Sequence, residues 1–261
     1  MPRPVGRLGA ALLVLAGMVG VVACSGPDTV PPAPTAPPTS PTATASPSPG
    51  ASATGSGTAA ATAAPTVAAE PTTTNTLPPP PPPTAPAPST AGDLDAKALP
   101  VPKGWRTVAL DGGEEEGFEG NGTWVHERDP RYAAADTVGV GCSPVTRDDY
   151  TDPVAALEGN YEGPGRLPGV GLAMEFADSG AAERYFALYR KQVEACTRAA
   201  GPVRTTLIDG VDGLADHRRY DDGDWTEVGR QVGRRVVLVI LSDPGHKIAR
   251  AEAQAILDQV R

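Results

Sequence analysis

The chain has 261 residues, with 22 Lys and Arg, 31 Asp and Glu, and a formal net charge of −9. Only four charged residues (Arg3, Arg7, Asp28 and Glu70) precede residue 93, so the rest of the chain, with 20 basic and 29 acidic residues, carries the whole net charge. This acidic balance argues against nucleic acid as a partner, because binding to phosphates needs a basic surface.

The N-terminus has the parts of an export signal. Arg3 and Arg7 lead into an uncharged, mostly apolar run at 8–23. This run is too short to span a bilayer comfortably, because a membrane-spanning helix needs about 20 apolar residues. The run ends in Val-Val-Ala-Cys, which resembles the lipobox of bacterial lipoproteins. Residues 1–23 are therefore predicted to be a signal peptide, and Cys24 is predicted to carry a lipid with palmitate-type chains. The alternative is an uncleaved anchor that happens to end at Cys24. The lipid would hold the protein to the extracytoplasmic face of the cell membrane without spanning it.

Residues 24–92 are predicted to be a disordered linker. They consist almost entirely of Pro, Thr, Ala, Ser and Gly, with six consecutive prolines at 78–83. Such a segment buries too little apolar surface to offset the entropy of ordering it. Its prolines favour extended polyproline II geometry, so it should act as a spacer. The composition is typical of high-GC actinobacteria.

Residues 93–261 are predicted to form one α+β domain. Asn121-Gly122 predicts a tight hairpin, because both residues tolerate positive φ. The clearest helix follows a cap at Asp178 or Ser179 and ends at Gly201-Pro202, and a second helix is expected at 247–260. Strands are predicted from alternating or β-branched runs at 105–110, 137–142, 155–163, 169–178, 203–208, 214–220, 225–229 and 235–242. This order predicts an antiparallel sheet with two helices packed on one face.

Two cysteines remain once Cys24 carries a lipid. In an oxidising compartment, Cys142 and Cys196 are most simply a disulfide. The alternative is a catalytic thiol, but no histidine follows in a recognisable motif.

The helix after Asp178 and its flanking strand carry a pattern of core positions at Phe176, Ala182, Tyr185, Phe186 and Cys196. A Val-rich strand and a short C-terminal helix follow. This pattern resembles the extracellular sensor domains of actinobacterial PknH-type receptor kinases and their lipoprotein relatives. The resemblance implies a cleft for an unknown ligand, but it identifies no binding residues here. Those domains often have two disulfides, whereas this one has cysteines for one.

Side chains capable of chemistry are few and scattered. His126, His217 and His246 lie far apart in sequence, and no serine has the surroundings of a hydrolase nucleophile. The acidic stretches at 114–116 and 221–224 lack the spacing of a calcium loop. The arginines at 218, 219, 230, 234 and 235 are expected to pair with nearby acids, with an anion site as the alternative.

The sequence therefore predicts a non-enzymatic sensor or ligand-binding lipoprotein, with no catalytic residues, no metal and no cofactor. Its expected partners are the membrane, through Cys24, and an unidentified ligand or protein of the cell envelope. The alternative function is a protein-interaction or envelope-assembly factor that docks a partner on its sheet.

Overall fold

The computed structural model describes residues 75–199, 201 and 203–261. The predicted signal peptide, Cys24 and the linker up to residue 74 lie outside the described residues. The α-helices are α1 (Pro130–Val138), α2 (Ser179–Cys196) and α3 (Arg250–Leu257). The strands are β1 (Arg106–Thr107), β2 (Gly112–Gly113), β3 (Phe118–Glu119), β4 (Val125–Arg128), β5 (Ala155–Glu162), β6 (Pro168–Glu175), β7 (Arg204–Leu207), β8 (Leu214–Tyr220), β9 (Gly223–Val232) and β10 (Arg235–Ser242).

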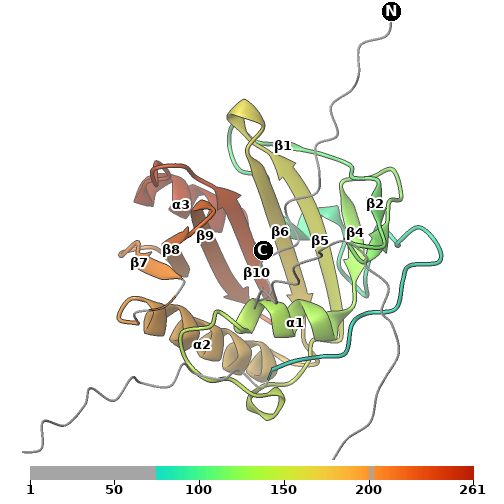
Figure 1. Cartoon of the computed structure of the whole chain (residues 1–261), viewed down its shortest axis with the longest axis horizontal. Helices are drawn as coiled ribbons and strands as arrows, with labels where there is room; N and C mark the ends of the chain where they lie inside the picture. The colour runs from blue at the N-terminus through green and yellow to red at the C-terminus, as the bar shows by residue number, and fades with distance from the viewer. Residues whose placement is uncertain (1–74, 200, 202) are drawn as a thin grey trace, which may run out of the picture. The chain divides into compact units, whose positions relative to one another are not determined.

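Most of these strands form one antiparallel sheet in the order β1-β5-β6-β10-β9-β8-β7 (Figure 1). β4 pairs with the same outer edge of β5 as β1 does, but nearer the start of β5. β2 and β3 form a separate small hairpin. A short turn at Pro164–Arg166 joins β5 to β6, and β8 and β10 have the predicted bounds.

Both faces of the sheet are covered, as the alternation along β10 shows. Val236 and Leu238 pack with residues of α1 and α2, whereas Val239 and Leu241 pack with α3 on the opposite face. Successive side chains of a strand point to opposite faces, which explains why a central strand covered twice is apolar throughout. In Figure 1, α1 and α2 cross the lower part of the view and α3 lies at the upper left.

The predicted fold class, an antiparallel α+β sheet with one disulfide, is confirmed. Two helices do pack on one face, but they are α1 and α2, and the closing helix α3 packs on the other. Asp178 caps α2 by accepting a hydrogen bond from the amide of Ala181 at 2.8 Å. The apolar stripe of α2, which includes the core positions of this helix named above, is buried: Ala182, Tyr185, Phe186, Tyr189, Val193 and Cys196.

The strand predicted at 137–142 is wrong, because the chain forms α1 up to Val138. Asp129 caps this helix, with its Oδ1 accepting from the amide of Arg131 at 2.9 Å, and Pro130 occupies the first turn. Proline is preorganised for that position, and the alanines that follow favour helix. The alternation of small and apolar residues that begins at Thr137 continues only into the loop after the helix, where it forms no strand.

The hairpin predicted at Asn121-Gly122 is also wrong, since β3 pairs with β2 and β4 pairs with β5. The Asn121 side chain instead accepts from the amide of Thr123 at 2.8 Å and donates to the carbonyls of Ala87 and Val125. An Asx turn thus replaces the two-residue hairpin turn.

The end of the predicted linker runs along the domain. The amide of Ala87 donates to the carbonyl of Glu119 at 2.9 Å, and the carbonyl of Pro88 accepts from the amide of Glu127 at 2.7 Å. Ala91 is buried beside Leu94. Residues 75–92, placed in the linker by composition, therefore belong structurally with the domain that was predicted to start at residue 93.

The predicted disulfide is present. Cys142, in the loop after α1, is bonded to Cys196, the last residue of α2, with a Cα–Cα distance of 5.0 Å. The bond closes a loop that holds β5 and β6 as well as α2. Among the described residues, no helix has the length and apolar character needed to cross a bilayer.

Candidate ligand-binding site

A cavity of about 640 Å³ lies between α1, β4 and the proline-rich residues 75–82, which we call the strap. The 114–118 turn forms another wall. This volume is in the range of small-molecule sites. The cavity brings together segments that are distant in sequence, because the strap crosses over β4 and α1 before the chain enters the sheet.

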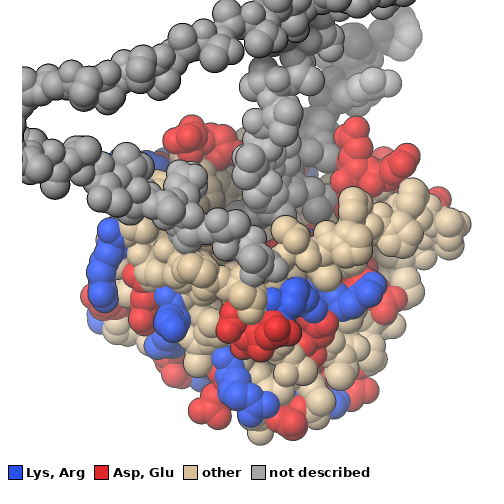
Figure 2. Space-filling view, turned by 60° about the horizontal axis from the view of Figure 1, so that its bottom comes forward, with Lys and Arg blue, Asp and Glu red and all other residues tan. Residues whose placement is uncertain are grey.

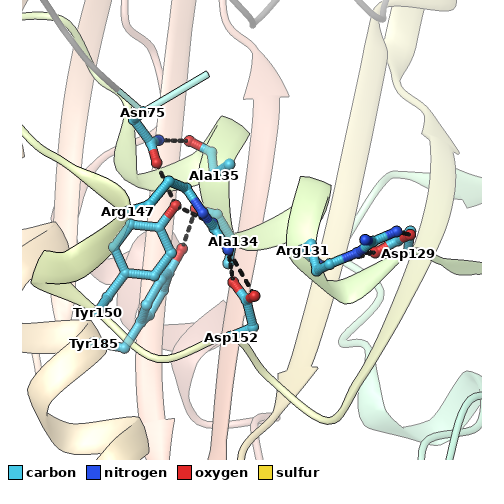
Figure 3. Close-up of polar contacts among 9 residues, drawn as sticks. All are labelled: Asn75, Asp129, Arg131, Ala134, Ala135, Arg147, Tyr150, Asp152 and Tyr185. Carbon is cyan, nitrogen blue, oxygen red and sulfur yellow. Dashed lines mark hydrogen bonds and ion pairs between the residues drawn. The ribbon is translucent and has the colours of Figure 1, made fainter. Parts of the chain in front are cut away.

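The strap is tied down at two points. Asn75 donates through Nδ2 to the carbonyl of Ala135 at 2.7 Å and accepts through Oδ1 from the hydroxyl of Tyr150 (Figure 3). Three residues farther on, the carbonyl of Pro78 accepts from the hydroxyl of Tyr132 at 2.6 Å. Proline carbonyls in extended geometry have no internal partner, so they are free to accept such bonds.

The partners of Asn75 are themselves held by further contacts. Arg147 donates to the hydroxyl of Tyr150 at 2.5 Å and binds both carboxylate oxygens of Asp152 at 2.6 Å (Figure 3). The hydroxyl of Tyr185 on α2 donates to the carbonyl of Ala134 at 2.8 Å, which holds α1 in place beneath the strap. The roof of the cavity is therefore fastened to groups that are fixed within the domain.

The floor of the cavity carries a charge cluster centred on Arg128 of β4. Its Nη1 contacts Glu158 of β5, and its Nη2 lies 2.5 Å from Oδ2 of Asp136 on α1. Burial acts to lower the pKa of Arg128, but the two carboxylates outweigh it and the net pKa is raised. The guanidinium is therefore a permanent cation with both ends engaged.

His126 lies beside this cluster, in register with Glu158 across the β4–β5 pair. Its ring stacks on Phe118 with centroids 3.7 Å apart. Burial lowers the pKa of His126, an effect that Glu158 opposes and Arg128 adds to. The imidazole is thus neutral at pH 7 and has a nitrogen that can accept a hydrogen bond.

A second buried charge cluster lies between the sheet and α2, away from the cavity. Arg218 of β8 binds Asp216 at 2.8 Å, Glu227 at 3.0 Å and the hydroxyl of Tyr189 at 2.6 Å. Oε1 of Glu227 is buried with no hydrogen-bond partner among the described residues. Burial raises the pKa of Glu227 to about 8. With two carboxylates and one guanidinium, one carboxyl group holds a proton in neutral solution.

The raised pKa of Glu227 predicts that stability depends on pH. Because the unfolded chain releases this proton near pH 4.5 and the folded chain near 8, the free energy of unfolding should fall as pH rises through that window. The loss should reach on the order of 4 kcal/mol at pH 8. Glu227→Gln should abolish this decline in urea titrations run at several pH values, whereas Glu183→Gln, on the exposed side of α2, should keep it. An unchanged slope in Glu227→Gln would assign the titration to another group.

The other two histidines, distant in sequence, meet at the far edge of the sheet. The rings of His217 and His246 stack with centroids 4.6 Å apart. His217 shares a hydrogen bond with Thr226 at 2.8 Å, and Thr226 donates to Asp243 at 2.7 Å. Threonine stands between the imidazole and the carboxylate, so the order differs from that of a nucleophilic triad, in which the histidine is central.

The remaining residues singled out in the sequence lie mostly outside the cavity. The arginines do pair with carboxylates: besides Arg218, Arg219 pairs with Asp224, Arg230 with Asp212, and Arg234 and Arg235 with Glu175. Acidic residues 114–116 border the cavity. Among the described residues, no group of three or more His, Cys, Asp or Glu side chains is arranged to hold a metal ion. On the face that Figure 2 shows, basic and acidic side chains are interspersed.

The sequence reasoning missed Asn75, Arg128, Asp136 and Glu158 as members of a site. Asp136 was missed because its helix was not predicted, although the Asp129-Pro130 pair that starts α1 is a recognisable helix signal. His126 and Arg128 alternate along β4 and thus share a face, which a strand assignment at 125–128 would have revealed. No sequence signal points to Asn75.

The chain matches no protein-family model, and no curated protein matches it at a significant level.

Proposed function

We propose that this chain is a lipid-anchored, extracytoplasmic lipoprotein whose folded part binds a small ligand, without catalysing a reaction, in the cavity under the strap. The observation that carries this proposal is the cavity itself, onto which Arg128, Asp136, Glu158 and the neutral His126 converge. A concave space with a few converging polar groups is the usual form of a ligand site. The lipobox that ends at Cys24 and the PknH-like core pattern support the location and the sensor role.

A second function, docking of a protein partner on the sheet, has less support. α1 and α2 cover one face of the sheet, while α3 and the segment around Leu94 and Leu99 cover the other. The sheet thus offers little open surface to a partner, and we do not propose this function.

The binding role is tested by thermal unfolding of the full-length protein in the presence of fractions of cell-envelope small molecules. A ligand should raise the melting temperature in a saturable way, because binding to the folded state alone stabilises it. His126→Phe should remove most of this shift, since phenylalanine keeps the stack on Phe118 but loses the ring nitrogens. His217→Phe, the same change outside the cavity, should keep it. Absence of any saturable shift from a chemically diverse set would contradict the binding role.

The anchoring role is tested separately by metabolic labelling with a palmitate analogue. The unaltered protein should incorporate the label and sediment with membranes, and Cys24→Ala should do neither. Labelling that persists in Cys24→Ala would contradict the lipobox assignment.

A further inference from the structure

The floor of the cavity carries more negative than positive charge. Arg128 faces two carboxylates, those of Glu158 and Asp136, and each of its terminal nitrogens is already engaged by one of them. An anionic ligand would have to displace one of these carboxylates to reach the guanidinium. Burial raises the pKa of Asp136, an effect that Arg128 only partly opposes. The charge on Asp136 is thus incompletely compensated, and a cation close to it would be stabilised.

His126 is a polar side chain that lines the cavity without a hydrogen-bond partner in the described part of the chain. It is only 5% exposed, and its Nε2 lies 3.8 Å from Oε1 of Glu158, which is too far for a hydrogen bond. Because the imidazole is neutral, its free nitrogen can accept a hydrogen bond from a donor in the cavity.

The walls extend this negative character outward. Arg128 is the only Lys or Arg among the described residues that line the cavity, whereas acidic residues of the lining lie at Glu114, Glu115, Glu116, Glu127, Asp129, Asp136 and Glu158. Pro78, Phe118 and the aromatic ring of Tyr132 supply apolar and aromatic wall between them. Aromatic faces and carboxylates are both favourable neighbours of an organic cation.

We propose that the cavity binds a protonated organic amine, with its ammonium group donating to Asp136, Glu158 and His126 and its aliphatic body lying against the strap. The inference rests on the proposed function, since it names the class of ligand for the same cavity. It adds that the site should reject anions and prefer an amine to a neutral compound of the same size.

The test is calorimetric titration of the full-length protein with three compounds of similar length: cadaverine, pentanediol and glutarate. Cadaverine should bind at least about tenfold more tightly than the other two, because hydrogen bonds to charged groups are the strong ones. A lysine blocked at both its α-amino and carboxyl groups presents the same ammonium as a peptide side chain. If cadaverine or the blocked lysine binds more tightly than pentanediol and glutarate, the inference is supported. The tighter binder of the two amines shows whether the ligand is a free amine or the lysine side chain of a peptide.

Matched variants separate a specific site from general attraction to an acidic protein. Asp136→Asn should weaken the binding of cadaverine at least about tenfold, while Asp222→Asn, which removes one charge from the exposed β8–β9 turn, should leave it unchanged. If Asp136→Asn does not fold, Glu115→Gln, in the exposed turn that borders the cavity, should still weaken binding about twofold. Equal effects of the 136 and 222 substitutions would overturn the inference.

The failure of this inference is distinguishable from failure of the proposed function. Suppose that glutarate or pentanediol binds as tightly as cadaverine and that His126→Phe weakens this binding. The cavity is then a ligand site but not an amine site. If no member of the diverse set binds, the binding role itself is lost.

Discussion

Replacing Arg218 with methionine should lower the free energy of unfolding by about 3–5 kcal/mol, the usual cost of breaking a buried ion pair from one side. The side chain of Asp216 is wholly buried, and that of Glu227 is nearly so. Methionine fills a similar volume but leaves the carboxyl groups of Asp216 and Glu227 and the hydroxyl of Tyr189 without their common donor. Urea unfolding followed by circular dichroism at pH 7 measures the change.

The neighbouring Arg219 provides the control for this experiment. Arg219 pairs with Asp224 at 2.7 Å, but its side chain is 60% exposed, so Arg219→Met should change stability little. Neutralising the cluster completely, by combining Arg218→Met with Asp216→Asn and Glu227→Gln, should recover much of the loss because no uncompensated charge remains. If Arg218→Met and Arg219→Met lowered the free energy of unfolding by similar amounts, burial would not explain the contribution of the Arg218 cluster to stability.

The double substitution Cys142→Ala and Cys196→Ala should lower the free energy of unfolding by about 4 kcal/mol, given the 54-residue separation of the two cysteines. The bond restricts the unfolded chain across α2, β5 and β6, so its removal mainly favours the unfolded state. The measurement is a guanidinium titration of the oxidised protein and of the double variant.

Two controls accompany the disulfide experiment. Reduction of the unaltered protein should reproduce the loss seen in the double variant, since both open the same loop. Cys24→Ala should leave the unfolding midpoint unchanged, because Cys24 takes no part in the bond. An unchanged midpoint in the double variant would rule out a stabilising role for the disulfide.

The sequence predicted well the elements whose type is visible in the spacing or the kind of their own apolar residues. The stripe of α2 has helical spacing, and β10 is a long β-branched run, so each was identified with its correct type. The apolar character of β10 also contained information that the prediction did not use. A strand apolar on both faces requires cover on both, which excludes an arrangement with every helix on a single face.

The candidate site could not be predicted because its members are united by tertiary contacts. Arg128, Asp136 and Glu158 come from β4, α1 and β5, and only the pairing of β4 with β5 brings the first and last together. Composition was a poor guide to the strap, because a segment with few apolar side chains can still be ordered through the hydrogen bonds of its polar groups. Asn75 and the Pro78 carbonyl achieve this by bonding to a domain that already exists.

The hydrogen bonds of the strap stand first in line to any tension applied through residues 1–74. Residues 1–74, which include Cys24, join the described part of the chain at Asn75, so tension along the chain acts first on the hydrogen bonds of Asn75 and then on the Tyr132–Pro78 bond. Peeling the strap away would remove the roof of the cavity. By thermodynamic reciprocity, a ligand held beneath the strap raises the work needed to peel it, and tension lowers the affinity for that ligand. Occupancy by the proposed ligand and mechanical load would thus act on the same equilibrium.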